Sequence, residues 1–193
     1  MNTIKECFNI ILYGNEADSR LAAASGREKY EDIVAVVNTS PDSYEKISEG
    51  WRQENFVMAV SVIYFLHDRE TQPDFLVPWL FQLLQHPNGY IRYAAVKMIS
   101  NEIGPLTYHL RFPGEKLSFR ETIPKDADMV LYSLFASLNG LLVSLWQTKY
   151  KKYKYVNLLP PSPYKSVQMV LAELEDCCGK KYIDRLVYLT KPF

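Results

Sequence analysis

The sequence predicts an all-α protein, a single helical domain over residues 1–193, with one small β-hairpin inserted. Three observations favour this fold class. Apolar residues recur at intervals of three and four along most of the chain, as in helices with one buried face. Proline and glycine stand where one such run ends and the next begins. One stretch alone, residues 106–123, alternates apolar and polar residues with the period of a strand.

The N-terminal helices are delimited by glycine, serine and proline. A first helix is expected over residues 3–13 and ends at Gly14, and short helices follow over 18–25 and 28–38. Another begins at Ser40, because serine is a good N-cap and the proline that follows it suits a first turn.

The central helices have the clearest apolar faces. A strong helix is expected over residues 51–66. Its inward face would carry side chains three and four positions apart: Phe56, Ala59, Val60, Ile63 and Leu66. Pro73 separates it from a helix over 74–85, and a tight turn separates that helix from one over 90–103.

Three C-terminal helices are expected over 128–150, 162–177 and 180–189. The first contains the stretch 129–148, which has no charged residue and is followed by lysines, so its length and flank would suit a membrane span. Serine, asparagine, glutamine and threonine dilute its hydrophobicity. We therefore expect a buried helix of a soluble α-protein.

Residues 106–123 are the segment in which the period changes. Two alternating runs flank a Pro-Gly pair, and this arrangement predicts a β-hairpin. Leu110 and Phe119 would lie on the face turned towards the helices, because an isolated hairpin is marginal in water. The competing interpretation is that Pro105 begins another helical turn and the alternation is accidental.

The composition is that of a globular protein with a formal net charge of zero. Apolar residues make up 48% and charged residues 23%, and the 22 basic residues equal the 22 acidic ones. No net charge therefore draws the chain to nucleic acid or to an anionic membrane. Cys7, Cys177 and Cys178 form no disulfide framework, since adjacent cysteines rarely bridge each other. A reducing compartment, the cytoplasm, is predicted.

The sequence contains none of the common nucleotide-binding, metalloprotease, hydrolase or calcium-loop motifs. The histidines, His67, His86 and His109, lie far apart, and none has a cysteine at zinc spacing. Cys177 and Cys178 lie at the end of a predicted helix, where the helix dipole opposes a thiolate. We predict no catalytic, cofactor-binding or metal-binding residue, and an enzyme is the less favoured interpretation.

The stretch LVPWLFQLLQHPNGYIRYAA, in which a turn joins two apolar runs, resembles a HEAT repeat. The turn carries Pro87, and Arg92, Ala94 and Ala95 stand where that family has Val-Arg-x-Ala-Ala at the start of the second helix. His86 occupies the place of the family's usual aspartate. Arg92 is therefore expected to cap a neighbouring carbonyl or to lie free, rather than to join a ladder of Asp–Arg pairs.

The resemblance covers about residues 73–104, with degenerate units expected around Phe56 and Lys165. At least three repeats are normally needed to bury a continuous core. It implies an antiparallel helical stack, an α-α superhelix, that works as a protein–protein interaction module through its exposed helix faces. An irregular helical bundle with one HEAT-like helix pair is the alternative.

Two basic features are candidates for binding a partner or an anion. The run KYKKYKY, residues 149–155, interleaves lysines with tyrosines, a composition that tracks a phosphate backbone and stacks on bases. The second feature is the polar face of the hairpin. Together they give the candidate residues His109, Arg111, Arg120, Lys149, Lys151, Lys152 and Lys154. The alternatives are a helix end whose lysines complement the dipole, and a solvated strand face.

The sequence as a whole favours a non-catalytic, HEAT-like scaffold whose protein partner is acidic where it meets the lysine run. Because HEAT-like folds include DNA glycosylases, a nucleic-acid-binding protein is one alternative. No aspartate here matches that family's catalytic residue, and the zero net charge predicts only weak binding to nucleic acid. A membrane-anchored protein, held through residues 129–148, is the other alternative.

Overall fold

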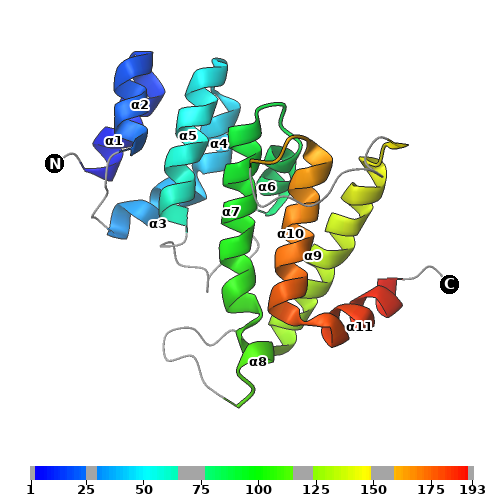
Figure 1. The fold of residues 1–193 in the computed structure, drawn as a ribbon. Coiled ribbons are helices and arrows are strands. Elements are labelled where there is room, and N and C mark those ends of the chain that lie inside the picture. Colours follow the sequence, from blue (N-terminus) through cyan, green and yellow to red (C-terminus); the bar gives the residue numbers. More distant parts are fainter. Residues whose placement is uncertain (1–2, 25–29, 65–76, 115–123, 149–158, 191–193) are drawn as a thin grey trace. The chain divides into compact units, whose positions relative to one another are not determined.

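A computed structural model describes residues 3–24, 30–64, 77–114, 124–148 and 159–190 (Figure 1). Regular structure in these ranges is helical, and no strand occurs in them. The all-α prediction is therefore confirmed for the described part of the chain. Two compact units are distinguished, Met1–Met98 and Ile99–Phe193, and their boundary falls inside a helix. The prediction of a single domain stays a prediction.

The first unit is organised around one helix, α5. Its helices are α1 (Ile4–Tyr13), α2 (Glu16–Ala24), α3 (Tyr30–Asn38), α4 (Ser40–Glu45), α5 (Gly50–Ile63), α6 (Val77–Leu84) and the first part of α7 (Gly89–Leu106). Helices α1, α2, α3 and α4 each pack against α5. On α5 the predicted inward residues are buried: Phe56, Ala59, Val60 and Ile63. Leu66, the last of that predicted face, lies outside the described residues.

Side-chain caps explain where the first helices begin. Thr3 and Glu6 form a reciprocal capping box at the start of α1. The side-chain oxygen of Asn15 accepts a hydrogen bond from the backbone N–H of Asp18 at 2.9 Å, so α2 begins at Glu16, before the expected start at residue 18. Ser40 lies inside α4 rather than at its N-cap, and its hydroxyl donates to the carbonyl of Val36 at 2.7 Å.

The turn between α6 and α7 is held by one buried arginine. Nη1 of Arg92 donates to the carbonyl oxygens of His86 and Pro87, at 2.6 Å and 2.7 Å. Ala94 and Ala95, on the same helix, are buried. Of the two outcomes expected for Arg92, capping of a neighbouring carbonyl is the one found. Burial, together with the Arg92 charge, lowers the pKa of His86 below its usual value.

The second unit is organised around α10. It contains the end of α7, α8 (Tyr108–Arg111), α9 (Pro124–Ser144), α10 (Pro163–Cys178) and α11 (Lys180–Thr190). Helix α10 packs against α8, α9 and α11, and α11 packs against α9 (Figure 1). Its core is apolar: Leu131, Leu134, Phe135, Leu138, Val167, Val170 and Leu174.

Both ends of α10 follow from its sequence. Ser162 is the N-cap, and its hydroxyl accepts the backbone N–H of Lys165 at 3.3 Å. Pro163 occupies the first turn, where its missing N–H costs nothing. Gly179 ends the helix with φ +77° and ψ 153°, a conformation that is nearly confined to glycine. This residue lets α11 leave α10 abruptly and turn against α9.

The predicted β-hairpin is wrong over its described half. Leu106 ends α7, with Pro105 inside that helix, and Tyr108–Arg111 form the short helix α8. Leu106 and Thr107, which a strand would point to opposite faces, are both buried. The alternating pattern was misleading because residues at every second position include pairs four positions apart, and such pairs also lie on one face of a helix. Tyr108 and Phe112, four apart, have ring centroids 4.8 Å from each other.

The remainder of the proposed hairpin, residues 115–123, lies outside the described residues. The alternative in which the chain continues helically after Pro105 describes the first half correctly. Thr107 supports that continuation, because its backbone N–H and its hydroxyl both donate to the carbonyl of Ile103, at 3.0 Å and 2.7 Å.

Candidate functional site

Helix α9 is apolar on more than one side. Leu131, Leu134, Phe135 and Leu138 face the core of the second unit. Met129, Tyr132 and Val143 are exposed, Val143 to 76%. An amphipathic helix of a soluble protein normally places polar residues on that side. The expectation of a buried helix therefore holds for one face only.

Within the described ranges, α9 also passes the length and composition test for a membrane span. The span Asp126–Ser144 has 19 residues, and an 18-residue window within it has a mean hydropathy of 1.4 and is 28% buried. Core helices of soluble proteins pass the same test.

Helix α11 supplies a second exposed apolar face next to that of α9. Leu186 is buried against the unit, whereas Val187, Tyr188 and Leu189 are exposed. Because α9 and α11 pack against each other, their exposed side chains border a common depression. We call this depression the α9–α11 groove.

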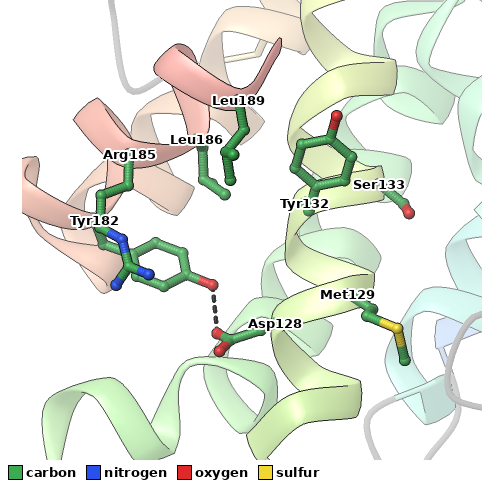
Figure 2. A pocket seen from close by; sticks show the side chains of 8 residues that line it. All are labelled: Asp128, Met129, Tyr132, Ser133, Tyr182, Arg185, Leu186 and Leu189. Atoms are coloured by element: carbon green, nitrogen blue, oxygen red, sulfur yellow. Dashed lines mark hydrogen bonds between the residues drawn. The ribbon is translucent and has the colours of Figure 1, made fainter.

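The α9–α11 groove consists of two adjoining hollows. The first, of about 460 Å³, is lined by Asp128, Met129, Tyr132, Ser133, Tyr182, Arg185, Leu186 and Leu189 (Figure 2). The second, of about 540 Å³, is lined by Tyr132, Phe135, Ala136, Asn139, Gly140, Val143, Val187 and Leu189. The hollows share Tyr132 and Leu189, so the groove continues along α9 from Asp128 to Val143. At 1.5 Å per residue this is about 22 Å, roughly four helical turns.

One end of the groove is polar, and Asp128 is at its centre. The Tyr182 hydroxyl donates to Oδ1 of Asp128 at 2.5 Å, as Figure 2 shows across the gap between α11 and α9. Nε2 of His109, on α8, lies 3.1 Å from the same oxygen. We call these three residues the Asp128 junction. It joins α8, α9 and α11 through one carboxylate oxygen.

The other carboxylate oxygen of Asp128, Oδ2, accepts no hydrogen bond from the residues that the structure describes. The Asp128 side chain is 50% exposed. Arg185 lies beside the Tyr182 ring, with its Cζ 6.0 Å from the ring centroid. It forms no ion pair with any described residue. The polar end of the groove therefore presents an open carboxylate oxygen on α9 and a guanidinium group on α11.

Near Asp128, burial and neighbouring negative charge keep the Tyr182 phenol and the Cys177 and Cys178 thiols in their uncharged forms. Burial, followed by the hydrogen bond to Asp128, raises the pKa of Tyr182 above its usual value. Burial, followed by the neighbouring Cys177 and Asp128, raises the pKa of Cys178 to about 12. Burial and Glu173 also raise the pKa of Cys177. Neither thiol is poised as a thiolate nucleophile.

The two described residues of the predicted basic face do not form an open anion site. His109 lies against a carboxylate in the Asp128 junction. Nη2 of Arg111 donates to the carbonyl oxygen of Gly104 at 2.8 Å. The hairpin face that would have grouped them is absent here, because this segment is helical. The other candidates lie outside the described residues: Arg120, Lys149, Lys151, Lys152 and Lys154.

The repeat-structural candidates all belong to the first unit. Pro87 contributes a carbonyl oxygen to Arg92, and Ala94 and Ala95 contribute buried, small side chains to α7. Oε2 of Glu54, on α5, accepts a hydrogen bond from the Asn88 side chain at 2.6 Å and ties the turn to the preceding helix. No group of three His, Cys, Asp or Glu side chains able to hold a metal ion occurs in the described ranges.

Sequence reasoning did not single out the groove residues. The available signal was the uncharged run of 129–148, whose apolar residues are not confined to one helical face and so cannot all be buried in one interface. As a sequence pattern, that run indicates a buried helix or a membrane span, and neither interpretation predicts a groove. The pairing of Asp128 with His109 and Tyr182 had no local signal.

Comparisons with protein-family models, with curated proteins and with solved structures gave no match to this chain. The resemblance to HEAT repeats is therefore carried by the residues of the α6–α7 segment alone.

Proposed function

We propose that this chain is a non-catalytic, HEAT-like interaction module of the cytoplasm that binds a protein partner through the α9–α11 groove. The observation that carries the proposal is the exposed apolar lining of that groove. Val143, Leu189 and Met129 are 76%, 58% and 55% exposed. Contiguous apolar surface of this kind on a soluble protein marks an interaction site more often than it serves stability.

The shape of the groove favours a helical segment as its occupant. A small-molecule site is a compact, enclosed cavity with convergent polar groups. This groove instead runs about four turns along α9, and its charged groups lie at one end. An amphipathic helix laid along it would bury apolar residues at i, i+4 and i+7 against Tyr132, Val143 and Leu189.

A non-catalytic role is supported by the chemistry of the described site residues. The Cys177 and Cys178 thiols have raised pKa values, and Tyr182 is held as a phenol by Asp128. A nucleophile or general base needs a pKa near the working pH and a partner that activates it. These groups are shifted in the opposite direction.

The test compares two neighbouring residues of α11. Leu189 lines both hollows, whereas Tyr188 is more exposed and lines neither. The full-length chain and its Leu189→Glu and Tyr188→Glu variants are used as bait in a native lysate, and the captured proteins are quantified. A true groove partner should be retained by the parent chain and by Tyr188→Glu, and should fall about tenfold or more with Leu189→Glu.

Equal retention by all three baits would contradict the proposal. So would the loss of the partner with Tyr188→Glu but not with Leu189→Glu, because the docking face would then lie elsewhere on α11.

The lysine run gives the partner a second proposed feature. We expect an acidic surface on the partner to meet Lys151, Lys152 and Lys154, because no net charge elsewhere reinforces the run for nucleic acid. Changing these three lysines to glutamate should weaken partner capture and reduce its salt dependence. Sub-micromolar binding of nucleic acid at about 150 mM salt, lost in the same variant, would instead make nucleic acid the ligand.

A further inference from the structure

The polar end of the α9–α11 groove carries two charged groups of opposite sign with open bonding positions. Asp128 uses Oδ1 for Tyr182 and His109, which fixes the carboxylate in place, and Oδ2 accepts no hydrogen bond from the described residues. Arg185 stands on the opposite helix beside the Tyr182 ring and has no ion-pair partner in the described part of the chain. Both residues line the first hollow (Figure 2).

Charge complementarity then specifies what should occupy this end. A cationic side chain can donate to Oδ2 of Asp128, and a carboxylate can pair with the guanidinium group of Arg185. On one face of a helix, residues three or four positions apart have Cβ atoms about 5–6 Å from each other, so a single helical turn can present both charges. The rest of the groove, towards Val143, is lined by no charged residue and takes the adjoining turns.

We infer that the segment bound in the groove is an amphipathic helix whose apolar stripe ends in one basic and one acidic side chain, the basic one on Asp128 and the acidic one on Arg185. The inference rests on the proposed function and specifies the partner of that same groove. It also fixes the direction of the bound helix, because only one of its ends carries the pair. The acidic surface proposed to meet the lysine run is a separate feature of the partner.

Preorganisation strengthens the inference. An exposed ion pair is normally worth little, because two flexible side chains must be held in one geometry. Here the carboxylate of Asp128 is already fixed by the donors from α8 and α11, so less conformational freedom is lost when a cation binds. The expected contribution of the Asp128 contact is about fivefold in affinity, near the upper end for a partly exposed pair.

The test is a selection of helix-favouring peptides of about 16 residues, long enough to span the groove, displayed against the full-length chain. The parent chain should enrich peptides with apolar positions at i, i+4 and i+7 and a basic–acidic pair at one end. Asp128→Asn should weaken the selected peptides about fivefold and reduce their salt dependence. Asp126→Asn is the matched control, because Asp126 is exposed on the same helix and does not line the groove, and it should change affinity less than twofold.

Reversing the charge of Arg185 tests the acidic half of the pair directly. Selection against Arg185→Glu should replace the acidic residue of the enriched peptides by lysine or arginine and leave the apolar positions unchanged. In Asp128→Asn the side-chain amide oxygen can still accept a hydrogen bond from the Tyr182 hydroxyl. An unchanged thermal midpoint of each variant shows that the fold is intact.

Enriched peptides with an apolar stripe but no charged pair, or equal effects of Asp128→Asn and Asp126→Asn, would overturn this inference and leave the proposed groove intact. Peptides whose binding ignores Leu189→Glu would remove the proposed function as well. A groove-dependent dimer of the chain, or groove-dependent binding to vesicles of anionic lipid, would also overturn the inference by supplying a different occupant.

Discussion

The α6–α7 turn and the Asp128 junction each use one charged side chain to hold neighbouring segments, and they differ in burial and in sequence range. Arg92 is 4% exposed and bonds to carbonyls five and six residues away. Asp128 is half exposed and bonds to residues 19 and 54 positions away. In the first arrangement a buried guanidinium group donates to two carbonyl oxygens of its own turn. The second keeps one oxygen open at the edge of a groove.

This difference separates structural from binding residues. A buried charge whose partners are removed is costly, so the α6–α7 turn is expected to dominate local stability. An exposed charge contributes little to stability and is free to recognise a partner.

The largest loss is expected for Arg92→Ala. The substitution removes two charge-assisted hydrogen bonds and leaves the carbonyl oxygens of His86 and Pro87 without this donor, at a cost of about 3 kcal/mol. Denaturant unfolding measures the loss. Lys97→Ala, on the exposed side of the same helix, is the control and should cost less than about 0.5 kcal/mol. Similar losses for the two variants would remove the proposed role of Arg92.

Ala95→Leu should follow, with a loss of about 1–3 kcal/mol. Ala95 is fully buried on α7, and a leucine there would overpack a close contact. Lys97→Leu adds a similar side chain at an exposed position and should be nearly neutral. Superimposable melting curves for Ala95→Leu and the parent chain would contradict close packing at this position.

Tyr182→Phe should cost less, about 1 kcal/mol, because the hydrogen bond to Asp128 is partly exposed. The raised pKa of Tyr182 adds a pH signature. Its contribution is fully present below the unfolded value near pH 10 and is lost as the pH rises through the higher folded pKa.

The parent chain should therefore lose stability above pH 10 more steeply than Tyr182→Phe, which has no phenol to ionise at this position. Cys178, whose pKa is also raised, titrates in both proteins. Tyr188→Phe, on the same helix but exposed, is the control and should keep the alkaline slope of the parent. Equal slopes for the parent and Tyr182→Phe would show that the Asp128 contact does not form in solution.

The smallest effect on stability is expected for Leu189→Glu, within about 0.5 kcal/mol. Leu189 is 58% exposed, so its replacement removes little buried area. A loss above 2 kcal/mol would mean that this residue supports the fold, and the lysate comparison with Leu189→Glu would then have to use a milder substitution.

The helices were predictable because their start and stop signals are local. Ser162-Pro163 and Gly179 bound α10 much as their residue types require. The helical structure of the segment after Pro105 was not predictable. Apolar residues at every second position fit one face of a strand, and those four positions apart also fit one face of a helix. In the structure Leu106 and Thr107 are both buried, as a helix allows and a strand with one buried face does not.

The candidate site was less predictable than the fold. His109 was chosen for a basic face and instead lies against Asp128, because tertiary packing brings α8 to the start of α9. Tyr182 reaches Asp128 only after Gly179 has turned α11 back against α9. Contacts between residues this far apart in sequence depend on the complete fold, and no spacing rule encodes them.

The central claim is that the α9–α11 groove is the docking face, and methyl NMR of the full-length chain with a selected peptide tests it most directly. Leu189 and Val143 line the groove, and each has an exposed counterpart of the same type elsewhere, Leu21 on α2 and Val62 on α5. The account predicts that the methyl signals of Leu189 and Val143 shift on titration, while those of Leu21 and Val62 do not. Shifts at Leu21 and Val62 with unchanged signals from Leu189 and Val143 would contradict it.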